Sequence, residues 1–181
     1  HMPQIVFGVM SAHPTHQITI PQPEETIRFD KPNACNQCHL DWSVNRVVAA
    51  TKRLWPKTYG VSKPGGARFD EPEGERALFA GDAVMRALTA AAMMPANDST
   101  APLLLEALQD RYPIVRYFAA NDLAARYPIL PKPDYLATTA ERDATLQSWY
   151  PHWAPDLLRE ARTARERLSA GRTEVDVEVG E

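Results

Sequence analysis

Two cysteines and a histidine carry the strongest chemical signal in this chain. They stand together as Cys35-Asn36-Gln37-Cys38-His39, and the 181 residues contain no other cysteine. The pattern Cys-x-x-Cys-His is typical of covalent haem c attachment. Two thiols at this spacing can reach the two vinyl groups of one porphyrin, and the next residue then offers an imidazole nitrogen to the iron. The sequence predicts one haem c per chain, held by Cys35 and Cys38, with His39 as the proximal iron ligand.

Other uses of two nearby cysteines fit this sequence less well. A structural zinc site needs four ligands, and the chain offers two thiolates and His39 with no second cysteine pair. A thioredoxin-like redox pair would follow a strand in an α/β pattern, whereas these cysteines follow a proline-rich segment. A disulfide would close a very short loop. Haem attachment is the interpretation that uses all three residues.

A second iron ligand can come from the segment that precedes the cysteines. His13 and His16 lie about twenty residues before the motif, so this segment can fold back and place one of them over the opposite face of the haem. We expect His16 to be the distal ligand. The alternatives are His13, Met10 and His152. Three further methionines at helical spacing are more typical of core packing: Met85, Met93 and Met94.

Aromatic side chains flank the motif and the helix that should follow it. Trp42, Trp55 and Tyr59 can pack on a porphyrin face, although ordinary core packing would explain them equally well. We include all three as candidate haem-contacting residues.

The segment that holds the motif has its own organisation. Residues 1–40 contain five prolines and no helical periodicity, which predicts an extended arm. Apolar residues then recur at helical spacing from Val44 to Trp55, so a helix should follow the arm and stop before Pro56. We assign residues 1–70 to a haem-binding segment.

The rest of the chain shows helical periodicity interrupted by prolines. A run from about Glu75 to Met94 predicts a single helix. Further on, Ser99 or Thr100 can cap a helix with Pro102 in its first turn. A partner helix starts at Pro113 and buries Val115, Phe118, Ala119 and Leu123, while Arg116 and Asn121 face elsewhere.

These helices suggest a repeat architecture. A further pair is predicted over about Glu141–Trp149 and Ala154–Ser169, so residues 71–170 read as antiparallel hairpins of HEAT-like type. Residues 171–181 form an acidic tail, in which Glu174–Val179 alternate acid and valine as an edge strand or an ordered tail would. The predicted fold is mainly α: an extended, proline-rich haem-binding arm followed by these hairpins.

The composition limits the classes of function. The chain carries 20 Lys and Arg against 23 Asp and Glu, a formal net charge of -3, and 44% of its residues are apolar. This balance gives no general attraction to nucleic acid, and we expect no such partner. No apolar run approaches the roughly 18 residues of a membrane span, so we expect no direct span.

The segment around the motif resembles a known family. Phe7-Gly8-Val9-Met10, His16-Gln17-Ile18 and the stretch from Lys31 to Asp41 are similar to multihaem c-type cytochromes whose C-terminal part carries HEAT-like repeats. That family commonly has a further haem motif ending Cys-His-Met-Pro before the phenylalanine. This chain begins His1-Met2-Pro3 and holds one motif. We expect His1-Met2 to be the remnant of an expression tag, and the alternative is a native sequence cut inside its preceding haem motif.

The resemblance implies a function. It makes Cys35 and Cys38 attachment sites, His39 the proximal ligand and His16 a haem-ligating histidine. We therefore predict an electron carrier rather than an enzyme, acting within a larger redox chain or complex. Its partners would be other redox proteins or haem domains, with a homo-oligomer left open. The alternatives are a haem-based sensor of gases or small molecules and a HEAT-type adaptor with a structural haem.

The resemblance also implies a location. Covalent attachment of haem c in bacteria is completed outside the cytoplasm. We therefore expect the protein on the periplasmic or extracellular side of a bacterial membrane.

Overall fold

The computed structural model of the chain describes residues 2, 4–6, 10–16, 20–56, 64–93 and 97–172. The prediction of a mainly helical protein is confirmed. The described elements are β1 (Gln4–Val6), β2 (Ala12–Pro14), α1 (Glu24–Phe29), α2 (Val44–Leu54), α3 (Glu73–Ala80), α4 (Ala83–Ala92), α5 (Ala101–Ala107), α6 (Pro113–Arg126), α7 (Thr139–Trp149) and α8 (Pro155–Ser169), with the 3-10 turns η1 (Ala67–Phe69) and η2 (Tyr150–His152). Tyr59, Met94 and the stretch 173–181 of the acidic tail lie outside the described residues.

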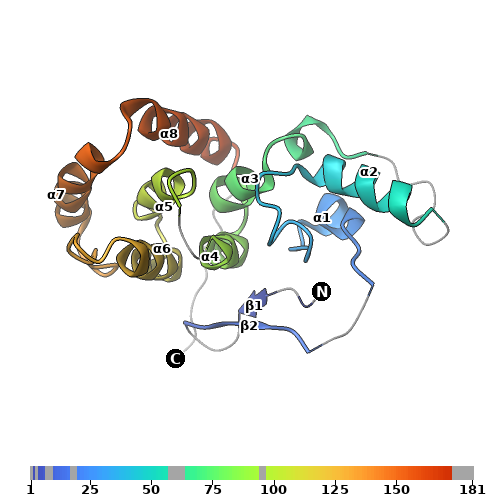
Figure 1. The fold of residues 1–181 in the computed structure, drawn as a ribbon, viewed down its shortest axis with the longest axis horizontal. Helices are drawn as coiled ribbons and strands as arrows, with labels where there is room; N and C mark the ends of the chain where they lie inside the picture. Colours follow the sequence, from blue (N-terminus) through green and yellow to red (C-terminus); the bar gives the residue numbers. More distant parts are fainter. Residues whose placement is uncertain are drawn as a thin grey trace.

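The helices follow one another along an elongated molecule, from α2 at one end to α7 at the other (Figure 1). α4 packs against both α3 and α6, and α5 packs against α6. α8 returns along the molecule and makes its main contacts with α3 and α5 rather than with α7. The last helix therefore covers the preceding helices instead of adding another stacked pair.

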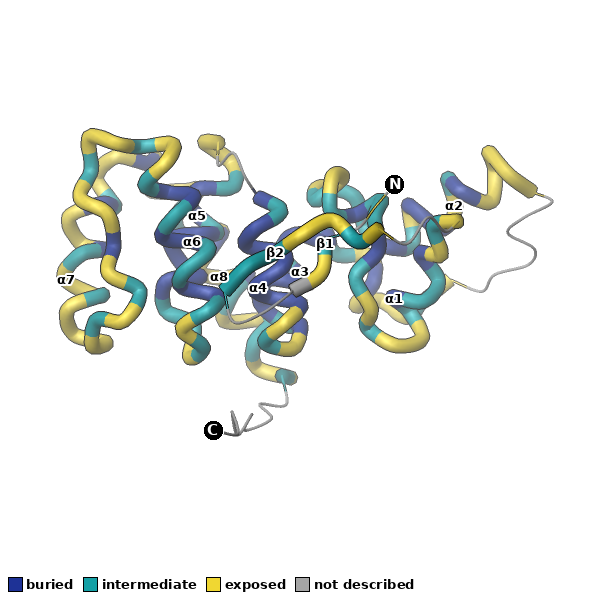
Figure 2. The backbone as a smooth tube through the Cα atoms, turned by 90° about the horizontal axis from the view of Figure 1, so that it is seen from below, coloured by how far each residue is buried: buried dark blue, intermediate teal, exposed yellow. Residues whose placement is uncertain are grey.

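Two separate hydrophobic cores hold the chain together. The larger one lies among α3 to α8, where Leu104, Leu105, Val115 and Leu123 are fully buried. The smaller one, in the segment that carries the motif, consists of Val44, Val48 and Phe69 with Ile27 packed against them. Figure 2 shows this difference as the dark central helices and the paler N-terminal part. The motif therefore sits in a segment with little core of its own.

The predicted single helix over residues 75–94 is wrong, because two helices, α3 and α4, replace it. Asp82 has extended backbone and caps α4, since its Oδ1 accepts a hydrogen bond from the Met85 amide at 2.7 Å. At Gly81, a Cβ atom would lie 2.6 Å from the Ala77 carbonyl oxygen. Apolar periodicity continues across this corner, which is why the sequence pattern alone missed it.

The predicted extended arm is also partly wrong. β1 and β2 form an antiparallel hairpin that contacts α4, and α1 follows the hairpin. Pro23 lies at the N-cap of α1, with Glu24 and Glu25 in the first turn, a pattern that suits a helix start. α1 ends at Asp30, whose backbone adopts a left-handed conformation at φ 53°. The high proline content predicts an extended arm, but Pro23 stands at the start of a helix instead.

The hairpin formed by α5 and α6 begins with different capping contacts from those predicted. α6 begins at Pro113 as expected. Before α5, however, neither Ser99 nor Thr100 caps the helix with its side chain; Asn97 Oδ1 instead accepts hydrogen bonds from the amides of both residues. The side chain of Asn97 fixes this turn because it can accept several backbone donors at once.

Arg116 does not face away from the core, contrary to the prediction. Its side chain is buried, and its guanidinium donates to the carbonyl oxygens of Tyr135, Asp110 and Arg111, each at 2.7 Å. A guanidinium has five donors, so one arginine can satisfy several otherwise unpaired carbonyl groups at a helix corner. Arg116 thereby joins the start of α6 to the chain that leads into α7.

Polar contacts also join the motif-bearing segment to the helical part. Arg76 of α3 donates to Asp30 Oδ1 at 2.8 Å and forms a two-point ion pair with Glu73. At the start of α3, the Gly74 amide donates to the Leu40 carbonyl at 2.8 Å and the Glu73 amide to the Trp42 carbonyl at 3.1 Å. The free amides of a helix N-terminus thus hold the chain immediately after the motif. Among the described residues, no helix is both long enough and apolar enough to cross a membrane.

Candidate functional site

The motif forms one tight, helix-like turn. The His39 amide donates to the Cys35 carbonyl at 2.9 Å, and the Gln37 amide donates to the Asn33 carbonyl at 3.2 Å. In such a turn, residues i, i+3 and i+4 lie on the same side. Cys35, Cys38 and His39 occupy these three positions, so the turn places both cysteines and the histidine on one side of its backbone.

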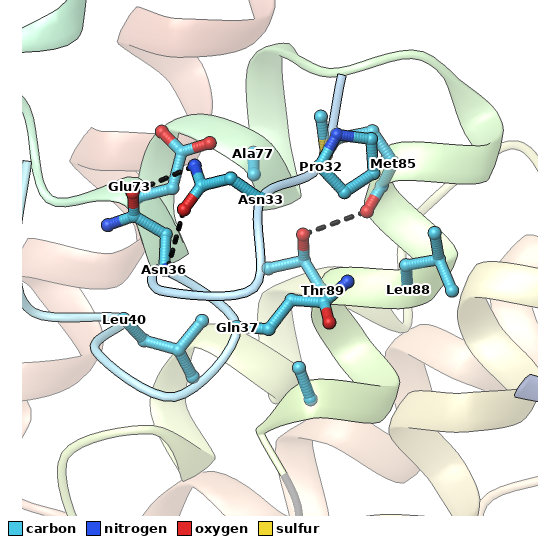
Figure 3. Close-up of a pocket in the computed structure, with 11 residues that line it drawn as sticks. Pro32, Asn33, Asn36, Gln37, Leu40, Glu73, Ala77, Met85, Leu88 and Thr89 are labelled. Atoms are coloured by element: carbon cyan, nitrogen blue, oxygen red, sulfur yellow. Dashed lines mark hydrogen bonds between the residues drawn. The ribbon is translucent and has the colours of Figure 1, made fainter. Parts of the chain in front are cut away.

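Two asparagines hold this turn in shape. Asn33 Oδ1 accepts the Asn36 amide at 2.9 Å, and Asn33 Nδ2 donates to Asn36 Oδ1 at 3.0 Å and to Thr26 Oγ1 at 2.9 Å. Asn36 Nδ2 reaches on to the Trp42 carbonyl at 2.8 Å. Both asparagines are buried, and Figure 3 shows their side chains turned toward one another. Sequence reasoning missed these residues, although a pair of asparagines beside a turn is a recognisable signal.

The inner side of the turn is packed against the helical part. A cavity of about 20 Å³ separates it from α3 and α4, with Asn33, Gln37 and Leu40 on one side and Ala77 and Thr89 among the residues on the other (Figure 3). A space of this size holds about one water molecule. A porphyrin cannot enter there, so any macrocycle attached to the turn must lie on its outer side.

The outer side of the turn is accessible. Cys38 and His39 are exposed and Cys35 is half-buried. The His39 ring stacks on the Trp42 ring, with 4.8 Å between the centroids, and the Arg46 guanidinium covers Trp42 at 4.0 Å from the ring centroid. This stack limits the orientations of the imidazole while leaving it at the surface. Cys38 and His39 thus have the accessibility that haem attachment requires, and Cys35 has it in part.

The surroundings of the Cys35 thiol differ from those of a typical catalytic or metal-binding cysteine. Burial, with a smaller contribution from Cys38, raises the pKa of the Cys35 thiol above its usual value. Catalytic and metal-binding cysteines instead have lowered pKa values, because the thiolate is the reactive form. In the part of the chain that the structure describes, no group of three or more His, Cys, Asp or Glu residues is arranged to hold a metal ion.

The N-terminal hairpin lies next to the motif. The Gln4 amide donates to Gln37 Oε1 at 2.6 Å, and Gln37 Nε2 donates to the Gln4 carbonyl at 3.0 Å. Gln4 pairs with Pro14 across the hairpin, and neighbouring strands lie about 4.8 Å apart. Pro14 therefore lies one strand away from Gln4, the residue that binds Gln37. His13 and His16, both exposed, are within two residues of Pro14.

The remaining predicted residues differ in their positions. Met10 is half-buried just before β2, and Trp55 is exposed immediately after α2. His152 lies in η2 beside Trp153, with 6.2 Å between the ring centroids, and this part of the chain is at the opposite end of the molecule from α1 and α2 (Figure 1). The structure thus brings His13 and His16, but not His152, toward the motif.

Large apolar side chains are exposed in the segment that carries the motif. Six such residues lie within the first 55 positions: Met2, Ile5, Ile20, Phe29, Leu54 and Trp55. Apolar surface that meets water in a segment with a small core fits the presence of an apolar macrocycle. The residues present are therefore compatible with a covalently held haem.

Comparison with protein-family models, curated proteins and solved structures found no match to this chain.

Proposed function

We propose that this chain is an electron-transfer domain of c-type cytochrome class, carrying one haem c on Cys35 and Cys38. The observation that carries the proposal is the turn that places Cys35, Cys38 and His39 at positions i, i+3 and i+4, with Cys38 and His39 exposed and its inner side packed. Once bound, the haem supplies an iron that changes between two oxidation states.

Attachment requires only the thiols and the vinyl groups. Each thiol adds across one vinyl double bond: sulfur bonds to one carbon and the hydrogen goes to the other. No electron is gained or lost, and no further reactant is needed. The chain contributes the spacing of Cys35 and Cys38, which the hydrogen bonds of Asn33 and Asn36 hold in place.

The imidazole ligands would come from two elements. His39 stands at the end of the turn, where Trp42 orients its ring. His16 would serve the other side, because the pair of hydrogen bonds between Gln4 and Gln37 keeps the N-terminal hairpin beside the motif. Two strong imidazole ligands favour a low-spin iron with both axial positions filled, which suits electron transfer.

The helices from α3 to α8 would act as a platform. We assign them to HEAT-like repeats that present the haem-binding segment to neighbouring redox proteins or haem domains. The family resemblance and the packing of α5 against α6 support this assignment. Within the same proposal, the protein works on the periplasmic or extracellular side of a bacterial membrane, where haem c attachment is completed.

A redox titration followed by carbon monoxide addition tests this function. We expect reversible oxidation and reduction, a low-spin spectrum and no change when carbon monoxide is added to the reduced protein. Stoichiometric carbon monoxide binding by the unaltered protein would instead favour the sensor alternative, in which the sixth position is open. Failure to cycle reversibly would favour the adaptor with a structural haem.

A further inference from the structure

The helix that follows the motif has two different faces. Val44, Val47, Val48 and Thr51 form its buried face. On the opposite side, Trp42 and four residues of α2 line an open groove of about 400 Å³: Arg46, Ala49, Ala50 and Arg53. The groove exists because two alanines lie between two long arginines, so the helix surface is recessed between them.

This groove starts at the motif. Trp42 lines its beginning and stacks on the His39 ring with 4.8 Å between the centroids. Arg46 and Arg53 are seven positions apart, which corresponds to about 10 Å along the helix axis. The groove therefore extends from Trp42, whose ring stacks on the candidate iron ligand, along the outward side of α2 for about two helical turns.

The groove has a positive charge that the described part of the chain does not neutralise. Arg46 and Arg53 form no ion pair with any described residue. Elsewhere many arginines have carboxylate partners: Arg76 pairs with Glu73, Arg86 with Asp110 and Arg165 with Glu106. The stretch 42–69 contains six Lys and Arg residues and no Asp or Glu, although the whole chain has a net charge of -3. A local excess of this kind raises the concentration of anions near the groove.

We propose that this groove is the surface on which the haem binds. Ala49 and Ala50 lie against the porphyrin edge, and Arg46 and Arg53 bind its two propionate groups. This inference rests on the proposed attachment of haem to Cys35 and Cys38. Guanidinium groups are well suited to carboxylates, because their paired donors match the two oxygens. Alanine allows the macrocycle to approach the helix, where a larger side chain would hold it away.

An acidic partner protein is the competing occupant of the same charges. The haem is favoured for two reasons. First, the groove begins at Trp42, whose ring stacks on His39. Second, the cavity of about 20 Å³ on the inner side of the motif is too small for a porphyrin, so the porphyrin must lie on the outer side. A docking surface for a partner would not need a recess between two alanines next to the iron ligand.

Nuclear magnetic resonance of the reduced holoprotein tests the position of the haem directly. A porphyrin ring current shifts nearby methyl protons strongly. We expect large shifts for the methyl groups of Ala49 and Ala50, assigned with the variants Ala49→Ser and Ala50→Ser, and an ordinary shift for Ala67, an exposed alanine in η1. Ordinary shifts for Ala49 and Ala50 in a protein with haem attached would overturn the inference.

The midpoint potential of the haem tests whether the two arginines bind the propionates. Positive charge near the iron favours the reduced state, so Arg46→Gln/Arg53→Gln should lower the potential. The matched control is Lys52→Gln, which removes the same charge from the same helix at an exposed position outside the groove. The potential should fall further per charge removed in the arginine variant than in the control.

The outcomes separate this inference from the proposed function. Equal shifts per charge for the arginine variant and Lys52→Gln, with haem attached in both, would overturn the propionate contacts and leave the cytochrome proposal standing. Weakened binding of an acidic redox partner without a change in potential would assign the groove to that partner and overturn the inference as well. A wild-type chain without attached haem would overturn both proposals.

Discussion

The side-chain amide of Gln37 forms two hydrogen bonds with the backbone of Gln4, as a neighbouring strand would. Gln37 Oε1 accepts from the Gln4 amide at 2.6 Å, and Gln37 Nε2 donates to the Gln4 carbonyl at 3.0 Å. Gln37 lies between the two cysteines of the motif. These two hydrogen bonds therefore join the N-terminal hairpin to the turn that would hold the haem.

Replacing Gln37 should release the hairpin. Gln37→Ala removes both hydrogen bonds, and we expect a loss of about 1–3 kcal/mol in the free energy of unfolding together with faster amide exchange at residues 4–6. Gln147→Ala, which changes an exposed glutamine of α7, is the control and should alter neither quantity. Unchanged exchange at residues 4–6 in Gln37→Ala would show that other contacts hold β1 in place.

The two histidines of the hairpin region should behave differently. His16→Ala should convert the low-spin haem to a high-spin form that binds carbon monoxide, because a strong imidazole ligand is replaced by water or a weaker ligand. His13→Ala should leave the spectrum unchanged. The opposite result would assign the distal position to His13. If neither variant changes the spectrum, the sixth ligand is Met10, a group from another chain or absent, because His152 lies at the opposite end of the molecule.

A buried ion pair stabilises the corner between α5 and α6. Arg86 and Asp110 meet at 2.8 Å, and their side chains are 1% and 6% exposed. Asp110→Asn removes the carboxylate charge that faces the buried Arg86 guanidinium, and we expect a loss of about 3 kcal/mol or more in the free energy of unfolding. The exposed pair of Arg159 and Asp156 offers a control, since Asp156→Asn should change stability little. Similar losses in chemical denaturation of the two variants would contradict this account.

Local signals predicted some elements well and others poorly. α2 and α6 start close to where periodicity and Pro113 placed them, because one face of each helix is apolar and each start has a clear marker. The break at Gly81-Asp82 was not predicted, because apolar residues continue on both sides of it. The buried stripe of α6 predicts that Arg116 faces elsewhere, whereas three carbonyl groups bind its side chain in the interior.

The sequence predicts the reactive residues of the candidate site, but not the long-range contacts that hold them in place. The motif itself named Cys35, Cys38 and His39. The contacts of Gln4 with Gln37 join positions 33 residues apart, and the position of α8 depends on packing across the whole helical part. No local pattern specifies such long-range pairings, so they emerge only with the fold.

Stability should depend on pH through Glu106. Burial raises the pKa of this glutamate above its ordinary value, although Arg165 and Arg162 oppose the shift, and Glu166 and Tyr150 also face it. A raised folded-state pKa means that the contribution of Glu106 to stability is fully present below the ordinary glutamate pKa and is lost as pH rises through the folded value. We therefore expect Glu106→Gln to remove part of the fall in stability over this interval.

Unfolding measured by denaturant at several pH values checks this expectation. Glu160→Gln, at an exposed position of α8, is the matched control and should keep the wild-type pH dependence. Parallel curves for wild type and Glu106→Gln would show that the ionisation of Glu106 is not linked to folding.

Intact mass under denaturing conditions tests the central claim most directly. The chain, produced together with a haem c attachment system, should exceed its 20.2 kDa polypeptide mass by the mass of one haem, and Cys35→Ala/Cys38→Ala should show the polypeptide mass alone. A wild-type mass equal to that of the bare polypeptide would contradict the claim that this chain is a c-type cytochrome.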